Sequence, residues 1–532
     1  MSSDPHYDRR SLPILLLIHG SQLCISSQTF HSVLMTDTVL AMCGTRTATP
    51  DEHKRVRNVV AVALVSILLL VPCFWQQRIQ AGDLSSHIYN SWLEQQIESG
   101  NISGLVVAEQ RTNILFDLLL GSLYKHLGAQ TAQRIAVSLT VLIFFWASFA
   151  FISTVNGTQP WFITPVLAMV TYGWTFHSGL FNFYLSIGLS LWAVVLLWKG
   201  GRIRIMLGFL LLVLSYVAHG LGFCWAAGLI LYSWLYSNVP LRRKSTFLVA
   251  GLISVLVLTL LIRTHFITYW SPHQFLEASG IDQVWTFGAK YSIVSVALAL
   301  LWGFLFLRQS HAHSASEIIT SLTFQLSLIT ATVVLVVPTR IELPGFSAAL
   351  TFISERMTLP LDVLLCCFFA SSKPAKWQAG LLAATAVVYF SFIYVDTRAL
   401  NTAETQLTAA LVRIPTGQRV FSSFQGVPDD TRIPLWIHAT DRACIGKCLS
   451  YNNYEPYSAA FRIRTVSANP FVVSTAQDHY ALKYGGYVVG DKDLPLYQLQ
   501  PCGGTKICAV ALKTGEITKS YPIAIMPVLW KF

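Results

Sequence analysis

Charged residues are scarce in this chain of 532 residues. Asp, Glu, Lys and Arg together make up 12% of the sequence, whereas hydrophobic residues make up 53%. A soluble protein carries about 25% charged residues, and a disordered chain is poor in apolar residues. The low share of charged residues excludes a soluble protein, and the high share of hydrophobic residues excludes a disordered chain. Together they predict an α-helical polytopic membrane protein.

Several motifs of well-known soluble enzymes are also missing. The sequence contains no Walker A loop, no glycine-rich dinucleotide-binding fingerprint and no HExxH pair, so nucleotide hydrolysis, hydride transfer and zincin chemistry have no support. The net charge is +11, but no basic stripe is interleaved with aromatic residues. We attribute the positive charge to basic loops on one side of a membrane and exclude nucleic acid as a partner.

Long apolar runs predict about eleven membrane-spanning helices, each with roughly the 17–25 residues that a bilayer requires. They lie at 58–75, 131–154, 161–177, 181–198, 203–219, 221–237, 246–263, 289–307, 317–337, 357–372 and 377–395. The amphipathic segment 112–127 is assigned to the membrane surface, because its insertion would move four basic loops to the outside. The N-terminus is then cytoplasmic.

The chain divides into three parts. Residues 1–56 form a polar N-terminal segment that is either disordered or translated upstream of a true start at Met35 or Met42. Residues 57–395 form the transmembrane domain, and its first outer loop is 76–130. Residues 396–532 carry a soluble-like share of charge and predict a C-terminal extracytoplasmic mixed α/β domain.

The C-terminal segment contains two close cysteine pairs, Cys444 with Cys448 and Cys502 with Cys508. Each pair is either a disulfide or part of a zinc site. Neither spacing is that of a zinc ribbon, so we favour disulfides and predict no metal site. Disulfides require an oxidising compartment, which agrees with the outer placement of this segment.

The first outer loop opens with Asp83, and His87 follows four residues later. On a helix this spacing places both side chains on one face. The carboxylate could accept a proton from an acceptor hydroxyl, and the imidazole could orient that base or bind a phosphate. The alternative is structural, since Asp83 also suits the N-cap of a helix from Leu84 to Glu98.

Polar residues near the predicted outer boundary are candidates for substrate binding. Arg340 and Arg356 flank the ends of the ninth and tenth spans, and guanidinium groups bind phosphate oxygens. Alternatively, Arg356 reaches lipid headgroups or pairs with a neighbouring carboxylate. His177, Asn182 and His219 also fall at this boundary. They either line a cleft or serve as ordinary hydrogen-bonding groups.

Other features of the first outer loop complete a recognisable pattern, namely Leu93, Ile97, Gly100, Leu127, Gly128 and Arg134. With the Asp-x-x-x-His opening, they resemble the GT-C superfamily of membrane glycosyltransferases, including protein O-mannosyltransferases and aminoarabinose transferases. The specific motifs cover about residues 58–135. The architectural resemblance covers 58–395 and the extracytoplasmic tail.

The resemblance implies a GT-C fold and transfer of a sugar from a polyprenyl-phosphate donor, usually with inversion. It implies that Asp83 is the general base, with His87 beside it, and that Arg356 holds the donor phosphate. Two departures are evident. Asp83 is followed by Leu84 instead of another acidic residue, and the next outer loop, 177–182, has no carboxylate. We therefore assign no metal or other cofactor.

We expect a glycosyltransferase in a bacterial-type inner membrane. Its partners would be a polyprenyl-phosphate sugar, membrane lipid and a glycan, lipid or protein acceptor. A transporter or flippase for a lipid-linked saccharide is one alternative, but it would place ionisable groups near the bilayer midplane. A non-catalytic membrane assembly protein with the same fold is the other, because fold alone does not establish function.

Overall fold

The computed structural model describes residues 50–344, 349–372, 374–426, 432–433, 435–458, 461–466, 469–473, 475–503 and 506–523. Most of the predicted N-terminal segment 1–56 lies outside these residues. Met1–Ala63 and Leu64–Phe532 form separate compact units, and every contact given below lies within the second unit.

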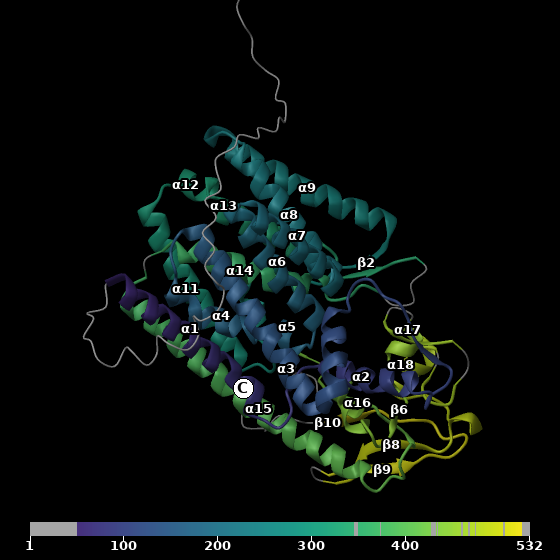
Figure 1. The fold of residues 1–532 in the computed structure, drawn as a ribbon. Helices are drawn as coiled ribbons and strands as arrows, with labels where there is room; N and C mark the ends of the chain where they lie inside the picture. The colour runs from purple at the N-terminus through teal and green to yellow at the C-terminus, as the bar shows by residue number, and fades with distance from the viewer. Residues whose placement is uncertain are drawn as a thin grey trace, which may run out of the picture. The chain divides into compact units, whose positions relative to one another are not determined.

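Six described helical segments are long and apolar enough to cross a membrane: Arg55–Phe74, Leu115–Asn156, Phe181–Lys199, Leu241–His265, Tyr291–Ala312 and Lys376–Leu411. They belong to α1 (Pro50–Phe74), α3 (Leu115–Asn156), α6 (Phe181–Lys199), α9 (Lys244–His265), α11 (Tyr291–Ala312) and α15 (Lys376–Leu411) (Figure 1). The chain therefore has the character of a helical membrane protein, while the count of eleven spans stays a prediction.

Shorter helices complete the helical part. These are α2 (Leu84–Glu98), α4 (Thr164–Thr171), α5 (Trp174–His177), α7 (Arg202–Ala218), α8 (Gly220–Ser237), α10 (Gln274–Glu277), α12 (Ala315–Thr320), α13 (Leu322–Val336), α14 (Ile353–Ala370), α16 (Ala439–Cys444), α17 (Glu455–Ser458) and α18 (Ala476–Tyr484). The 3-10 turns are η2 (Trp161–Ile163), η3 (Leu241–Arg243), η4 (Ile281–Val284) and η5 (Asp491–Asp493). Helix α6 is the most buried long helix and packs against α3, α7 and α8.

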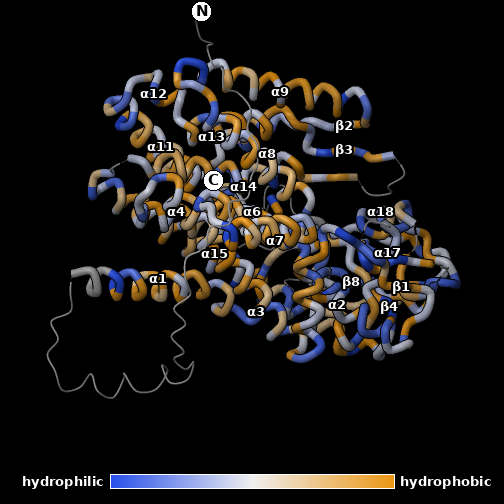
Figure 2. The backbone as a smooth tube through the Cα atoms, turned by 45° about the horizontal axis from the view of Figure 1, so that its top comes forward, coloured by the Kyte–Doolittle hydropathy of each residue, from blue (hydrophilic) through white to orange (hydrophobic). Residues whose placement is uncertain are grey.

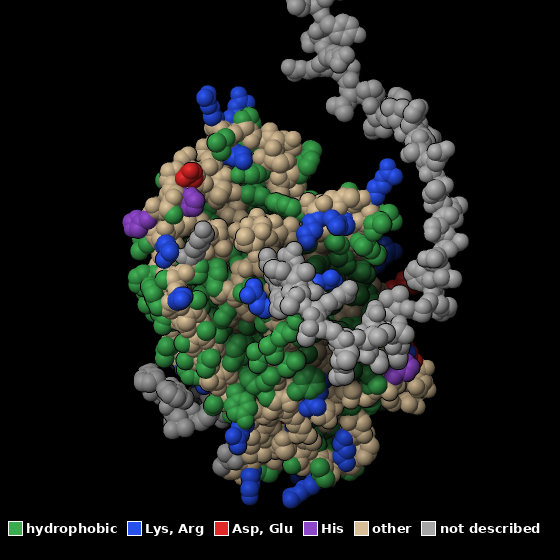
Figure 3. All heavy atoms as spheres, turned by 60° about the vertical axis from the view of Figure 1, so that its left-hand side comes forward, with side chains coloured by type: hydrophobic (Ala, Val, Ile, Leu, Met, Phe, Trp, Pro, Cys, Tyr) green, Lys and Arg blue, Asp and Glu red, His purple; other side chains and the backbone are tan. Residues whose placement is uncertain are grey.

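Apolar side chains are exposed along several of these helices. On α9, Val249, Ile253, Leu256 and Leu260 are each at least half exposed, and Figure 2 shows this helix hydrophobic along most of its length. Figure 3 shows hydrophobic side chains over much of one face, with Lys and Arg residues at its upper and lower ends and a few between them. An apolar face with basic ends is expected of a surface in contact with lipid.

Helix α3 is interrupted at Gly128, where φ is 72° and ψ is 171°. An unbroken helix of 42 residues would be about 63 Å long, roughly twice the hydrocarbon thickness of a bilayer. The interruption separates a segment that begins at Leu115 from the apolar segment after Gly128. This is the boundary expected between the surface helix 112–127 and the next span, although the membrane position of the first segment is still a prediction.

Helix α15 continues across the boundary predicted at residues 395 and 396. Asp396 was expected to mark entry into water, but it is fully buried and receives hydrogen bonds from Lys290 Nζ at 2.5 Å and Tyr291 Oη at 2.7 Å. The carboxylate has internal partners, so the helix extends to Leu411 before the sheet begins.

The C-terminal segment contains a four-stranded sheet in the order β6 (Leu449–Ser450), β4 (Arg419–Ser422), β8 (Leu496–Pro501) and β9 (Ile507–Ala511). Strand β4 is parallel to β6 and β8, whereas β9 is antiparallel to β8. The paired ribbons are β1 (Leu105–Val107) with β7 (Ile463–Thr465), β2 (Ile267–Tyr269) with β3 (Arg340–Glu342), and β5 (Phe424–Gly426) with β10 (Tyr521–Ile523). The β1–β7 ribbon joins the first loop to the C-terminal segment.

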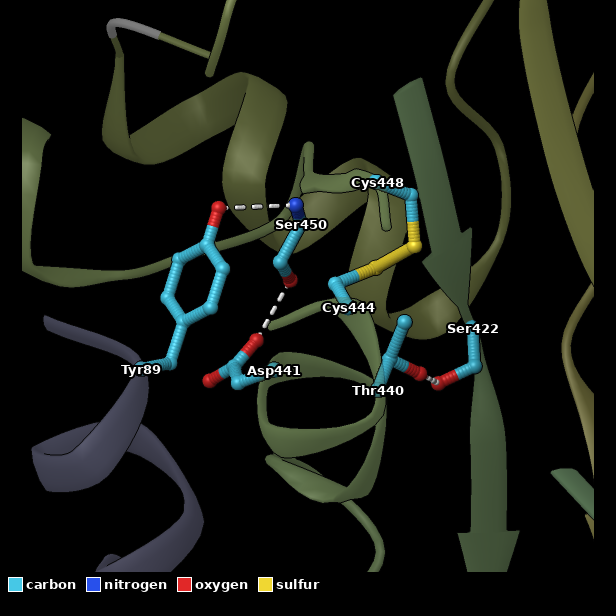
Figure 4. Close-up of a disulfide and its surroundings, with 7 residues drawn as sticks. All are labelled: Tyr89, Ser422, Thr440, Asp441, Cys444, Cys448 and Ser450. Atoms are coloured by element: carbon cyan, nitrogen blue, oxygen red, sulfur yellow. Dashed lines mark hydrogen bonds between the residues drawn. A yellow bond between two sulfur atoms is a disulfide. The ribbon is translucent and has the colours of Figure 1, made fainter. Parts of the chain in front are cut away.

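Both predicted cysteine pairs are disulfide-bonded in the structure, Cys444 to Cys448 and Cys502 to Cys508. The first disulfide closes the end of α16 and lies beside the start of β6 (Figure 4). It therefore tightens the connection that carries two of the site residues described next.

Candidate functional site

A tight turn holds the backbone at Asp83. The amide nitrogens of Gly82 and Asp83 donate to the carbonyl oxygens of His177 and Ser178, at 2.8 and 3.0 Å. Gly179 completes the turn with φ +82°, and a Cβ added there would lie 2.4 Å from the Asp83 nitrogen. Only glycine allows this approach. The turn thus positions Asp83 through the backbone rather than through the His177 side chain.

The Asp83 carboxylate does not cap its helix. Asp83 occupies the N-cap position of α2, at the start of the predicted helix, yet its side chain makes no capping hydrogen bond. The side chain is 33% exposed, and its Oδ1 lies 3.5 Å from Nε2 of His438. The carboxylate therefore does not act as a helix cap, which was the structural alternative in the sequence analysis, and it is available for proton transfer.

His438 is oriented by a second carboxylate. Its Nδ1 lies 3.1 Å from Oδ2 of Asp441, one turn further along α16, and the other oxygen of Asp441 accepts from the Ser450 hydroxyl. An imidazole that donates from Nδ1 to a carboxylate presents Nε2 as a proton acceptor. Asp83, His438 and Asp441 thus form a chain along which a proton can move.

Contacts with α2 and α15 hold this part of the C-terminal segment in place. The Ser450 amide donates to Tyr89 Oη at 3.0 Å, so α2 contacts the strand beside the disulfide (Figure 4). Arg442 makes a two-pronged ion pair with Glu404 of α15, at 2.7 and 2.6 Å. Because both partners are almost fully buried, the pair fixes α16 relative to Asp83.

His87 is held by Asp117 on the facing helix. Its Nδ1 lies 2.5 Å from Asp117 Oδ1, and the Asn182 amide donates to the other carboxylate oxygen at 2.7 Å. Burial alone would lower the pKa of His87, but the Asp117 carboxylate, followed by Asp83 and Glu455, raises it to about 9. His87 is therefore a cation at neutral pH, suited to bind a phosphate rather than to accept a proton.

A small polar cavity opens beside this pair, and its lining includes His87, Asn90, Glu94, Asp117, Glu455 and Arg462. Glu455 is 5% exposed, and burial together with the Asp117 charge raises its pKa to about 8. This carboxyl group is thus largely protonated at neutral pH. Glu94 and Arg462 form an ion pair across the cavity wall.

Hydrogen-bond donors outnumber acceptors around His219. Its Nδ1 accepts from the Leu221 amide at 3.1 Å, and its Nε2 lies 3.2 Å from Nη1 of Arg356. A neutral imidazole offers one acceptor and an imidazolium none, so at least one of these contacts brings two N–H donors together. Arg356 Nε is buried and has no partner among the described residues. Such an excess of N–H groups suits an anion.

Asp83 and Arg356 face the same region. Burial lowers the pKa of the Arg356 guanidinium, and the strongest opposing contribution comes from the Asp83 carboxylate. The same carboxylate acts on His87. The Asp83 charge and the contact between Arg356 and His219 link Asp83, His87, His219 and Arg356 as one electrostatic group, and Asn182 supports it through its bond to Asp117.

Two predicted residues do not join this group directly. His177 is buried, with Nδ1 3.0 Å from the Gln80 carbonyl oxygen. Arg340 lies on the exposed β2–β3 ribbon, where its Nη2 bonds Glu342 at 2.7 Å and its guanidinium lies over the Tyr269 ring. None of the described contacts of Arg340 involves the group around Asp83. Their assignment as substrate-binding residues remains a prediction.

The structure adds residues that sequence reasoning missed. Asp117 supplies a second carboxylate from the first outer loop, and the sequence alone assigned it no role in the site. His438 and Asp441 come from the C-terminal segment, and their spacing of three residues was the only local signal. Among the described residues, the one His, Asp and Glu group compact enough for a metal is His273, Glu277 and Asp282.

Comparison of the chain with protein-family models, with curated proteins and with solved structures finds no match. The function is therefore argued from the geometry of the group around Asp83 and from the resemblance in the first outer loop.

Proposed function

We propose that the protein is a membrane glycosyltransferase of GT-C type. It transfers a sugar from a polyprenyl-phosphate donor to an acceptor hydroxyl at the outer face of the membrane. One observation carries the proposal: a partly exposed carboxylate, Asp83, lies beside a proton-accepting His–Asp pair, and its charge acts on the Arg356 guanidinium, which contacts His219.

The acceptor hydroxyl gives its proton to Asp83 as the acceptor oxygen attacks the anomeric carbon. The new carbon–oxygen bond forms while the bond from that carbon to the phosphate oxygen breaks, and the electron pair leaves with the lipid phosphate. A single displacement inverts the anomeric configuration. The proton on Asp83 can pass to Nε2 of His438, where Asp441 stabilises the imidazolium.

The leaving phosphate needs preorganised positive charge. Arg356 and His219 supply N–H groups whose hydrogen bonds are incomplete among the described residues, and the cationic His87 adds a further positive group. These interactions strengthen as negative charge develops on the phosphate in the transition state. Held by Asp117, His87 is fixed for this role before the donor binds.

The polar cavity beside His87 supports an acceptor that carries hydroxyl groups. Its amide and carboxyl groups can donate to and accept from a sugar or a hydroxylated side chain. The neutral carboxyl group of Glu455 supplies a donor without adding charge. Glycan and hydroxylated protein acceptors fit this lining better than the acyl part of a lipid.

Asp83→Asn tests the assignment of the base. Asparagine keeps the size of the side chain and removes its proton-accepting charge, so we expect at least a 10²-fold loss of turnover. The assay follows release of lipid phosphate from polyprenyl-phosphate hexoses by the full chain in lipid nanodiscs. Glu342→Gln is the matched control on the exposed ribbon. Undiminished turnover in Asp83→Asn would show that Asp83 is not the base.

A further inference from the structure

A second group of titratable residues lies in the loop between β2 and α11. His273, Glu277 and Asp282 each offer a ligand atom, and these atoms lie within 4.8 Å of one another. Ligands about 2.1 Å from a metal ion are separated by about 3–4 Å. A small contraction of the loop would therefore bring the three onto one ion.

Two of these carboxylates are deeply buried with unused oxygens. Glu277 is 1% exposed and Asp282 is 0% exposed. Glu277 Oε2 and Asp282 Oδ2 have no hydrogen-bond partner among the described residues. A buried carboxylate oxygen without a partner is costly. Both oxygens therefore point to a ligand that the protein itself does not provide.

One guanidinium group contacts the cluster. Arg432 Nη1 lies 2.8 Å from Asp282 Oδ1, and its Nη2 lies 2.8 Å from His273 Nε2. The His273 nitrogen also lies 3.2 Å from Asp282 Oδ1. Arg432 thus satisfies one oxygen of Asp282, whereas Asp282 Oδ2 and Glu277 Oε2 have no partner among the described residues.

A third carboxyl group packs against the cluster. A Cβ added to Gly280 would lie 2.6 Å from Asp362 Oδ1, so this side chain packs against the same loop. Its Oδ2 has no partner among the described residues. Three buried carboxyl groups therefore lie at this loop, and the described ion pair of Arg432 involves one of them, Asp282, which leaves room for a cation.

Side-chain hydrogen bonds anchor the loop to the neighbouring helices. Gln274 donates from Nε2 to the carbonyl oxygens of Val334 and Val337, at 2.7 and 2.8 Å. Gln283 donates to the Thr358 hydroxyl on α14, and Gly280 adopts φ +77° between the two carboxylates. These anchors preorganise the ligands, as a metal site requires.

We propose that His273, Glu277 and Asp282 bind one divalent transition-metal ion. One imidazole and two carboxylates form a mixed nitrogen and oxygen set that suits Zn²⁺ or Mn²⁺. Asp282 would bind the ion through Oδ2 while Oδ1 keeps its bond to Arg432, as ligating carboxylates are commonly hydrogen-bonded by an outer partner. The site is independent of the proposed transferase chemistry.

The test is metal binding by the full chain in detergent. The protein is stripped with a chelator and equilibrated with Zn²⁺ or Mn²⁺ at increasing concentration, and the bound metal is measured by mass spectrometry. We expect one tightly bound ion per chain. Glu277→Gln and Asp282→Asn should each weaken binding by about 10–100-fold. The control variant, Glu342→Gln on the exposed ribbon, should bind as the unmodified protein does.

Absence of a tightly bound ion in the unmodified protein would overturn the proposal. Metal binding by both site variants that is as tight as that of the unmodified protein would also overturn it. If Asp282→Asn does not fold, Glu277→Gln and the unmodified protein still decide the outcome.

Discussion

Replacing Gly179 with alanine tests whether the turn at 177–179 holds Asp83 in place. Gly179 has φ +82°, where an L side chain costs roughly 1–2 kcal/mol. The added Cβ would lie 2.4 Å from the Asp83 nitrogen and 2.9 Å from the Leu84 nitrogen, and these backbone atoms cannot rotate away. Such overpacking costs about 1–3 kcal/mol more. We therefore expect Gly179→Ala to lower the unfolding free energy by about 2–5 kcal/mol.

Gly100→Ala is the matched control. Gly100 has φ +73°, and nothing lies within 4 Å of an added Cβ, so only the conformational cost of about 1–2 kcal/mol applies. Unfolding by SDS in mixed micelles compares the two variants, and donor turnover is measured on the same samples. A shift of about 1 Å in a reacting group costs about 10²-fold in rate. Turnover should fall in Gly179→Ala and persist in Gly100→Ala.

Equal losses of stability and turnover in the two variants would refute this reasoning. That result would mean that the Asp83 backbone can move away from the turn without consequence. The turn would then have no part in positioning the carboxylate.

Three further predictions concern the surrounding contacts. Glu404→Gln should lower the unfolding free energy by about 3–5 kcal/mol, because it leaves the Arg442 charge buried without a charged partner. Unfolding of the variant by SDS measures this loss of stability. A loss below about 1 kcal/mol would contradict the predicted role of the ion pair. The raised pKa of His87 means that protonated His87 stabilises the folded protein fully below pH 6.5 and progressively less as the pH rises to about 9. The difference in melting temperature between the unmodified protein and His87→Asn should therefore shrink over that range. A constant difference would exclude this linkage. Arg340→Gln should leave donor turnover unchanged, because the Arg340 side chain bonds Glu342; a loss comparable to that of a base variant would support the predicted role of Arg340 in substrate binding.

Local sequence patterns predict local structure well in this chain. The helix from Leu84 to Glu98 and the break at Gly128 both follow from apolar periodicity and from residue types with strong backbone preferences. The break between the transmembrane and C-terminal parts was placed at Asp396 on charge alone. That boundary stays a prediction, but helix α15 runs through it, and Lys290 and Tyr291, about a hundred residues earlier in the chain, satisfy the carboxylate.

The candidate site was only partly predictable for a related reason. Asp83 and His87 share a helix face, so their proximity follows from spacing. The approach of His438 to Asp83 depends on how the C-terminal segment folds onto the first outer loop, and no local pattern encodes that contact. Asp117 was visible in the sequence as an acidic residue in an apolar segment, but its bond to His87 requires the turn of α3 against α2.

Separating donor binding from donor turnover tests the central claim most directly. The full chain in nanodiscs would be given a radiolabelled polyprenyl-phosphate hexose, and binding and release of the lipid phosphate would be measured for Asp83→Asn and Arg356→Gln. Arg263→Gln, a change at an exposed arginine on α9, is the control. We predict that Asp83→Asn binds the donor but does not turn it over, that Arg356→Gln loses binding, and that Arg263→Gln does both normally. Retention of turnover by both site variants, or transport of intact donor without cleavage by the unmodified protein, would contradict the account.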